Sequence, residues 1–426
     1  PMQEPTWDGF RTVSFHDEER LHIQAEQQVQ GSFHRWWWNI QGWALAVTLG
    51  VCVSLTGALI EVGVNSISSP RFGFCKESPF APLRQCSNHE WKDWGDGFVA
   101  FVVSVVLGTA MAAASAVMVW GFAPAAAGSG IPEVKSILNG FVLPDVVALR
   151  TLCIKVPGLV LSVASGMALG KEGPLVHVAV CWAQLLSRSV PQFQNEGKRR
   201  ELFSAAAAAG VSTAFGAPLG GVLFSLEEVS SHFPSRTLLR AFTAAVAAAA
   251  VLSLVKASQS QGLTVFNVEY RTTCSPLEYV IFMLLGIIGG LVGATFNAIN
   301  IRWSALRARP SFRRRVHAIV EVTMIALITL ISSWPLTITQ PLSADAIHAM
   351  FEDCGPNTGN SALRVHLRLC TEDGHYTEVS RGLVFSLAAA AAVRLFQMTL
   401  TFGTACPAGL FVPSLFIGAS LGRCAG

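Results

Sequence analysis

The pentapeptide Gly170-Lys171-Glu172-Gly173-Pro174 interrupts an apolar stretch that runs from Val160 to Val176. A carboxylate at bilayer depth is unfavourable, and by default it marks an ion or proton pathway. The glycines let the backbone approach a ligand closely, and the proline suits the first turn of a helix. The pattern therefore predicts a broken membrane helix whose amino end faces an anion, with the protonatable Glu172 beside it.

The composition places this pentapeptide in a membrane protein. Of the 426 residues, 51% are hydrophobic and 13% are charged, and the mean hydropathy is +0.47. A hydrocarbon core of ~30 Å needs about 20 apolar residues in a helix. Runs of about this length recur along the chain: Trp43–Val62, Phe98–Trp120, Leu277–Val292, Ala318–Trp334 and Leu383–Leu400. We therefore expect an all-α protein that crosses the membrane several times.

The distribution of charge predicts which loops face the cytosol. Arg302–Arg315 carries six arginines and no acid, and Arg188–Arg200 is also basic. Such clusters can bind anionic lipid or RNA, but in short loops between spans the positive-inside rule explains them better. The acidic segment Pro335–Ser380 is then expected on the opposite side. The net charge of +3 gives no reason to expect nucleic-acid binding.

The cysteines predict two disulfides and no metal site. Cys75 and Cys86 share one expected luminal or extracellular loop, and Cys354 and Cys370 share another. The remaining apolar-segment cysteines are expected to be small core residues. No Cys/His spacing resembles a metal site, and no nucleophile–base pair or phosphate loop indicates an enzyme. We therefore expect a protein without a bound cofactor.

Two pairs of distant segments indicate an internal repeat. Leu49–Ala58 resembles Leu285–Ala294, with an offset of 285 − 49 = 236 residues. Gly170–Pro174 shares a Gly-x-x-x-Pro outline with Gly409–Pro413, with an offset of 409 − 170 = 239 residues. The alternative is a chance similarity between glycine-rich membrane segments. In secondary transporters such repeats often have inverted topology, and the substrate binds near the midplane between interrupted helices.

The repeat suggests a division of the chain into three parts. We expect a cytosolic N-terminal segment over residues 1–41, a first membrane repeat over 42–256 and a second over 277–426 that is incomplete at its C-terminal end. The expected helices of the first half lie at about 42–63, 97–120, 131–139, 146–168, 174–187, 201–215, 218–231 and 236–256. Several are too short to span a bilayer, which is tolerated where irregular backbone lines a cavity.

Two further motifs could bind an anion. Gly128-Ser129-Gly130-Ile131-Pro132 places a hydroxyl between two glycines, just before a short expected helix. Gly409-Leu410-Phe411-Val412-Pro413 offers backbone N–H groups ahead of another helix. Taken singly, Gly-Ser-Gly before a helix is a common N-cap. None of the three motifs supplies a fixed cation, and an anion held by amides and hydroxyls is bound only moderately, which suits rapid passage.

In this order the three motifs resemble those of the CLC family of chloride channels and chloride/proton exchangers. The longer segments GSGIPEVK, LGKEGPLVHVA, AFGAPLGGVLFSLEE and GLFVPSLFIGA are most similar to its eukaryotic endosomal exchanger branch. The resemblance covers the chain from about residue 42 to its end. It implies a CLC-type inverted repeat with broken and re-entrant helices, truncated in the second repeat, and a homodimer with one pathway per subunit.

The resemblance also implies roles for individual residues. Glu172 would be the gating and outer proton glutamate. Glu228, in Leu226-Glu227-Glu228, would be the inner proton glutamate, at a position where channels of the family have an apolar residue. Glu227 is expected only to cap a helix end at the cytosolic interface. The implied chloride-binding residues offer uncharged donors: Ser129, Gly130, Ile131, Gly173, Leu410 and Phe411.

Residues next to the gate have simpler interpretations. Lys171 either raises the local anion concentration or extends its amine towards the interface. His177, about one turn after Glu172, is expected to be a hydrogen-bonded core histidine rather than a proton relay. Coupling needs two protonatable groups, one reached from each side of the membrane, and we expect burial to desolvate both Glu172 and Glu228.

The motifs, the two carboxylates and the resemblance predict a chloride/proton antiporter with chloride as substrate and the proton as coupled ion. The resemblance implies about two chlorides per proton. Its expected site is an endosomal, vacuolar or other intracellular membrane, with the plasma membrane as the alternative. Two other functions stay open: a passive voltage-gated chloride channel and a non-conducting or regulatory membrane subunit. The non-conducting subunit is considered because, in the family, later helices supply a tyrosine that contacts the central chloride. The tyrosines of this chain, Tyr270, Tyr279 and Tyr376, are not at that sequence position. Paired cytosolic CBS modules are also expected to be absent from this chain.

Overall fold

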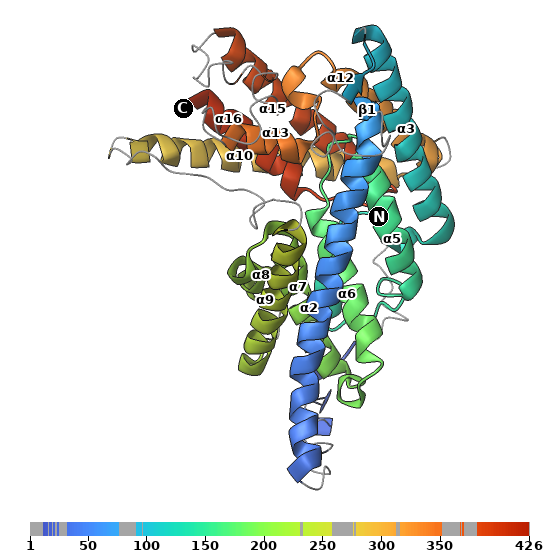
Figure 1. Cartoon of the computed structure of the whole chain (residues 1–426), viewed down its shortest axis with the longest axis vertical. Helices are drawn as coiled ribbons and strands as arrows, with labels where there is room; N and C mark the ends of the chain where they lie inside the picture. The colour runs from blue at the N-terminus through green and yellow to red at the C-terminus, as the bar shows by residue number, and fades with distance from the viewer. Residues whose placement is uncertain are drawn as a thin grey trace. The chain divides into compact units, whose positions relative to one another are not determined.

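The described part of the chain is almost entirely helical in its regular structure (Figure 1). In this computed structural model the described residues are 12–15, 17–18, 20–21, 24, 32–75, 91–95, 97–230, 233–257, 276, 278–311, 316–351, 367, 369 and 381–425. Within them the strands β1 (Gly73–Cys75) and β2 (Trp91–Asp93) pair antiparallel. The expected all-α class is confirmed.

The chain divides into two compact units, and neither is a continuous segment. Unit 1 comprises Pro1–Leu59, Ser129–Val156 and Glu172–Val265. Unit 2 comprises Ile60–Gly128, Pro157–Lys171 and Phe266–Gly426. The boundary passes between Gly128 and Ser129 and between Lys171 and Glu172, so it divides two of the three motifs. The sequence repeats over 42–256 and 277–426 are a different kind of division and stay a prediction.

Unit 1 is organised around α6 and α7. Its elements are most of α2 (Ser32–Ser68), α4 (Ile131–Leu138), the first half of α5 (Leu149–Ala164), α6 (Glu172–Ser187), η4 (Pro191–Phe193), α7 (Glu196–Phe215), α8 (Pro218–Phe224), the π-helix η5 (Ser225–Val229) and α9 (Ser235–Ala257). Helices α7, α8 and α9 lie side by side (Figure 1). Buried alanines such as Ala208 and Ala244 line this contact, because small side chains let membrane helices approach closely.

Unit 2 holds most of the second half of the sequence. Its elements are the end of α2 with η1 (Ser69–Arg71), β1, β2, α3 (Gly97–Phe122), η3 (Pro124–Ala126), the second half of α5, α10 (Glu278–Ala308), α12 (Ala318–Ser333), η6 (Thr337–Thr339), α13 (Ser343–Phe351), α15 (Arg381–Thr401) and α16 (Phe411–Ala425). Its core packs α13, α15 and α16 around the fully buried Ile347, Leu387 and Phe416.

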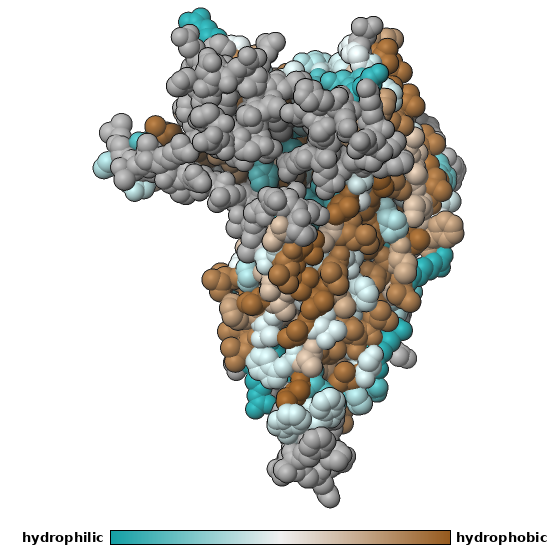
Figure 2. Space-filling view, in the orientation of Figure 1, coloured by the Kyte–Doolittle hydropathy of each residue, from teal (hydrophilic) through white to brown (hydrophobic). Residues whose placement is uncertain are grey.

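The outer surface of the described helices is apolar enough for lipid contact. By length and composition, five stretches could cross a membrane: Ile40–Arg71, Gly97–Phe122, Arg236–Ala257, Glu278–Ala308 and Arg381–Thr401. Phe98, Leu254 and Phe385 on these helices are 75%, 73% and 75% exposed. Hydrophobic residues also dominate the coloured surface in Figure 2. Apolar surface of this extent is stable in hydrocarbon rather than in water, so the membrane class is confirmed.

Some helix bounds differ from the sequence expectations. The apolar run Ala318–Trp334 forms α12, which ends one residue earlier, at Ser333; with 16 residues this helix is shorter than a bilayer span. Helix α7 begins at Glu196 rather than at 201, because the Asn195 side chain accepts a hydrogen bond from Lys198 N at 3.0 Å and caps the helix. The expected helix over 218–231 is instead α8 followed by η5.

The order of helix lengths supports the repeat, which we retain as a proposal. Helices α2 to α6 have 37, 26, 8, 16 and 16 residues. Among the described helices of the second half, α10, α12, α13, α15 and α16 have 31, 16, 9, 21 and 15. Both series have a short helix in third place. The fourth helix of each carries a fully buried cation, Lys155 and Arg394, and their offset of 394 − 155 = 239 equals that between Gly170 and Gly409.

Candidate functional site: three glycine loops and two carboxylates

Glycines from the three motifs meet through backbone hydrogen bonds in unit 2. Gly170 N donates to Gly409 O and Gly409 N donates to Gly170 O, each at 2.9 Å. Gly128 N donates to Cys406 O at 2.9 Å, and Gly128 O accepts from Ala408 N at 3.3 Å. These bonds hold the loop before α16 against the last residues of the segments that lead into α4 and α6. Main-chain pairing within unit 2 therefore joins Gly128 and Gly170, from the first two motifs, to the loop that leads into the third.

Buried side chains fix the same loop of unit 2. Ser162 Oγ, in α5, donates to Pro407 O at 2.9 Å and is fully buried. Arg307 donates from Nη1 to Phe402 O at 2.8 Å and from Nη2 to Leu400 O at 3.2 Å, and it forms an ion pair with Glu321. A cation at these carbonyls satisfies the C-terminal end of α15. The loop is thus anchored at both ends before α16 begins.

In unit 1 the start of α4 lies against α6. Gly130 has a φ of 79°, and a Cβ there would lie only 2.1 Å from Nδ1 of His177. His177 is fully buried, and its Nε2 lies 2.8 Å from Val146 O. The expectation of a hydrogen-bonded core histidine is thus confirmed at Nε2. Its Nδ1 packs on Gly130 and has no hydrogen-bond partner within the described ranges.

Ser129 and Ile131 form a local turn at the start of α4. Ser129 is half-buried, and its Oγ accepts a hydrogen bond from Ile131 N at 3.3 Å. The amide of Ile131, expected to point at an anion, therefore points at this hydroxyl oxygen in the structure. Because a contact of 3.3 Å is long for a hydrogen bond, a bound anion could replace it at small energetic cost.

Glu172 is the first residue of α6 and its side chain is buried. The residue is 4% exposed, and Gly173 after it is also buried. The helix begins two residues earlier than expected, so the carboxyl group lies in its first turn. Backbone N–H groups and the helix dipole favour a negative charge there, whereas burial disfavours it. A carboxyl group under two opposing influences is suited to gain and lose a proton.

Lys171, the residue before Glu172, forms an ion pair with Glu61 of α2, within unit 2. Its side chain is 17% exposed and that of Glu61 is 40% exposed. Neither interpretation of Lys171 from sequence included this partner. A signal was present, because Glu61 is an acid inside the apolar run Trp43–Val62, where ionisable residues are rare.

Glu228 lies in the π-helix η5 and pairs with Lys135 of α4. Lys135 Nζ is 3.0 Å from Glu228 Oε1, and the side chains are 47% and 58% exposed. The expectation that burial desolvates Glu228 is wrong, because more than half of its side chain is exposed. π-Helical turns are rare and occur often at functional sites.

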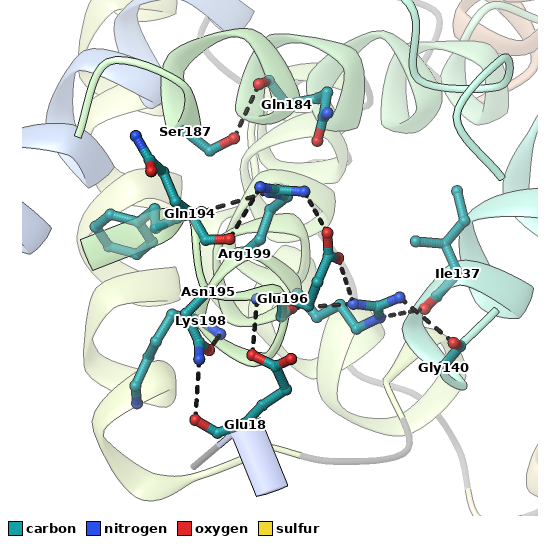
Figure 3. Close-up of polar contacts among 12 residues, drawn as sticks. Glu18, Ile137, Gly140, Gln184, Ser187, Gln194, Asn195, Glu196, Lys198 and Arg199 are labelled. Atoms are coloured by element: carbon teal, nitrogen blue, oxygen red, sulfur yellow. Dashed lines mark hydrogen bonds and ion pairs between the residues drawn. The ribbon is translucent and has the colours of Figure 1, made fainter. Parts of the chain in front are cut away.

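A charged cluster in unit 1 anchors the far end of α4 (Figure 3). Arg200 of α7 is 3% exposed and donates to Ile137 O at 2.9 Å and to Glu196 Oε2 at 2.8 Å. Glu18 accepts a hydrogen bond from Glu196 N at 3.2 Å, and Asn195 Nδ2 donates to Glu18 O at 2.9 Å. The N-terminal segment and α7 therefore hold the short helix that follows Ser129.

The expected chloride-binding residues divide between the units. Ser129, Gly130, Ile131 and Gly173 belong to unit 1, whereas Leu410 and Phe411 belong to unit 2. Leu410 packs beside the buried Phe296, and Phe411 is 36% exposed at the start of α16. Their amides lie at the N-terminal end of α16, where the first N–H groups of a helix have no acceptor within the helix itself.

The cysteine expectations are tested only in part. Cys75 is disulfide-bonded, and its expected partner Cys86 lies outside the described residues, as do Cys354 and Cys370. The cysteines of the apolar segments are free thiols: Cys52, Cys153, Cys181, Cys406 and Cys424. Within the described ranges no group of histidine, cysteine or acidic residues could hold a metal ion.

Broken helices joined by paired glycine loops are typical of membrane transport proteins. The chain belongs to the voltage gated chloride channel family, whose model matches residues 110–426. It is 34% identical to the H(+)/Cl(-) exchange transporter 3 of Homo sapiens over 461 residues, which cover 99% of this chain and 56% of that protein. It is 36% identical to the H(+)/Cl(-) exchange transporter 5 of Sus scrofa over 467 residues, which cover 99% and 56%. These relatives are named as transporters, not enzymes.

Solved structures show the same fold. A eukaryotic CLC transporter matches with a TM-score of 0.68 and 25% identity, covering 91% of this chain and 60% of that one. A slow cyanobacterial Cl−/H+ antiporter matches with a TM-score of 0.66 and 22% identity, covering 90% and 78%, and it shows the fold alone. The CLC-type fold is thus confirmed. The chain spans just over half the length of the two relatives above, and the truncation of the second repeat stays a prediction.

Proposed function

We propose that this chain is a chloride/proton exchanger in which Glu172 is the gate and Glu228 the inner proton station. The reciprocal pairing of Gly170 with Gly409, together with that of Gly128 with Cys406, carries the proposal. It supports the convergence of the three motifs that would bind the anion. The proposed chloride ligands are uncharged: Ser129, Gly130, Ile131, Gly173, Leu410 and Phe411.

The proposed cycle follows from competition between two anions for one place. The ionised carboxylate of Glu172 occupies an anion position and excludes chloride. Protonation neutralises it, the side chain leaves and chloride enters. The proton then moves towards Glu228 by a route that includes water. Because chloride and the carboxylate exclude each other, movement of one ion is tied to the other, and the family resemblance implies about two chlorides per proton.

A passive chloride channel is the second candidate, and the contact of Glu228 with Lys135 favours it. The carboxylate would have to leave an ammonium group before it could carry a proton inwards. The carboxylate of Glu228 supports the exchanger, because the family resemblance implies an apolar residue at this position in channels. The relatives are also named exchange transporters, and this chain matches just over half of their length.

The assembly and location are part of the same proposal. We expect a homodimer with one pathway per subunit, in an endosomal, vacuolar or other intracellular membrane. The repeats over 42–256 and 277–426 would supply the two halves of each pathway. An N-terminal segment over 1–41 would lie in the cytosol, where Glu18 meets the basic start of α7.

Flux from liposomes, recorded with chloride and pH electrodes together, tests the proposal. An exchanger moves protons against their gradient when chloride runs down its own gradient. Chloride flux without proton movement would instead establish the channel. Absence of both signals from folded, reconstituted protein would establish a non-conducting subunit.

A further inference from the structure

His177 of α6 packs on the turn that carries the proposed chloride ligands Ser129, Gly130 and Ile131. A Cβ at Gly130 would lie 2.1 Å from Nδ1, 2.4 Å from Cγ and 2.6 Å from Cβ of His177. One edge of the imidazole ring therefore fills the space that a side chain would need at position 130. His177 belongs to none of the three motifs and has no part in the proposed ion route.

The contact with Val146 determines which nitrogen of this ring carries a proton. Nε2 of His177 lies 2.8 Å from Val146 O, and a carbonyl oxygen can only accept a hydrogen bond, so Nε2 is the donor. In the neutral imidazole Nδ1 is then an acceptor with a lone pair, and among the described residues it has no hydrogen-bond partner. Because His177 is fully buried, Nδ1 faces the backbone of Gly130 rather than water.

The surroundings hold the ring and the turn in fixed positions. Val146 O also accepts a weak hydrogen bond from the Cys181 thiol, one turn further along α6, with an Sγ–O distance of 3.7 Å. Gly130 O accepts the first hydrogen bond of α4, from Val134 N at 2.9 Å. The apolar faces of α4 and α6 meet in one buried core that contains Val134, Ile137, Leu138, Val176, Ala179 and Val180. The imidazole therefore supports a turn that is itself the start of a packed helix.

This support matters because the turn would otherwise be easily deformed. Gly130 has a φ of 79°, and glycine has the widest backbone freedom of any residue. Donors select an ion by size only when packing holds them in position. The lone pair of Nδ1 also repels an anion, so an anion can approach the amide of Ile131 only from the face of the turn that the ring does not cover.

We propose that His177 is a positioning residue that sets the anion selectivity of the turn over residues 129–131. It acts through Gly130 and does not itself touch the anion. The inference rests on the proposed chloride ligands and deepens the proposed function, because it names what restricts this part of the site to a small spherical ion. With the ring in place the turn keeps the spacing that suits chloride. Without the ring the turn can recede and accept a larger anion such as nitrate.

Two polar substitutions separate the edge of the ring from its hydrogen bond. His177→Asn keeps Cβ, Cγ and an acceptor at the place of Nδ1, but it is too short to reach Val146 O. His177→Gln keeps a donor at the place of Nε2, but it has no atom at the place of Nδ1. His177→Ala removes both features. Cys181→Ala is the matched control, because it removes the other donor to Val146 O and leaves the imidazole in place.

The ratio of nitrate flux to chloride flux from liposomes measures the selectivity of each variant. His177→Ala should raise this ratio about three- to tenfold, and His177→Gln should raise it by a smaller factor. His177→Asn and Cys181→Ala should stay within about twofold of the wild type. An unchanged ratio in folded His177→Ala would overturn the proposal, and so would a shift in His177→Asn with none in His177→Gln. If His177→Ala does not fold, the contrast between the two polar variants decides.

Melting in detergent tests the same inference without transport. Chloride or nitrate is titrated against gluconate at constant ionic strength, and the stabilisation gives a midpoint for each anion. The chloride midpoint should rise about three- to tenfold in His177→Ala, and the nitrate midpoint should rise less. Equal changes in both midpoints would overturn the inference, because they indicate a general loss of the fold. A wild type that is stabilised by chloride but moves none would refute the exchanger alone, and one that is stabilised by neither anion would overturn both.

Discussion

Gly170 and Gly409 donate a backbone hydrogen bond to each other at equal lengths of 2.9 Å. They are also equivalent positions of the proposed sequence repeat, 239 residues apart (409 − 170 = 239). An antiparallel pair has a local two-fold axis between its partners. When the partners are repeat equivalents, that axis is the one expected to relate two inverted repeats. The pair thus joins the sequence evidence for a repeat to the geometry of the motif loops.

Gly130 should be far less tolerant of substitution than Gly128, although both have positive φ. Gly130→Ala would place a Cβ 2.1 Å from His177 Nδ1, whereas Gly128→Ala meets nothing within 4 Å. We expect about 1–2 kcal/mol of destabilisation for Gly128→Ala from φ alone, and about 3 kcal/mol or more for Gly130→Ala. Melting of the purified protein in detergent measures both. Adding His177→Ala should restore part of the Gly130→Ala loss, and no rescue would contradict the contact.

The ion pair of Glu61 with Lys171 should tune the pH dependence of the gate. Glu61→Gln removes a negative charge from beside Lys171, so the positive charge next to Glu172 acts more strongly and favours the ionised gate. More acid is then needed to open it, and the midpoint of chloride flux against pH should fall by roughly half a unit to one unit.

Lys171→Met should move the same midpoint upwards, because Glu61 then disfavours a second negative charge. The double variant Glu61→Gln with Lys171→Met should return close to the wild type. Chloride efflux from liposomes over a range of external pH measures the midpoints. Shifts of the same sign in both single variants would exclude an electrostatic origin.

Glu228 and Glu227 form a matched pair of adjacent exposed carboxylates. Glu228→Gln should abolish proton transport and leave chloride flux, because the inner station can no longer exchange a proton. Glu227→Gln removes an equal charge from the next residue and should keep coupling. Parallel pH and chloride recordings on liposomes make the comparison. Loss of coupling in both variants, or in neither, would remove the special role of Glu228.

Arg200 should stabilise unit 1 far more than a basic residue at the surface. Arg200→Ala removes hydrogen bonds to Ile137 O and Glu196 Oε2 and leaves buried acceptors unpaired, which should cost about 2–3 kcal/mol. The exposed Arg188→Ala should cost less than about 0.5 kcal/mol. Chemical denaturation in mixed micelles gives both values. Equal losses of stability in the two variants would show that the contacts of Arg200 with α4 contribute nothing.

The sequence predicted what local chemistry determines. The glycine–proline motifs located Gly170, Gly409 and the start of α4, because few residues other than glycine fit close backbone approaches and positive φ. The Asn195 cap and the π-helix over Ser225–Val229 were missed, although asparagine before an acidic turn is a recognisable helix start.

Pairings between distant residues were beyond prediction. Lys135 and Glu228 are 93 positions apart, and Lys171 and Glu61 are 110 apart, so no periodicity relates them. The only available signal was an ionisable residue within an apolar run, as at Glu61 and Arg394. That signal marks a residue as important without naming its partner, which depends on tertiary packing.

The most direct test of the exchanger is the Glu172→Ala variant, compared with wild type by simultaneous chloride and pH recording in liposomes. We expect Glu172→Ala to conduct chloride without proton movement and without the acid dependence of the wild type, because nothing ionisable then competes with the anion. Proton transport coupled to chloride in Glu172→Ala would contradict the account.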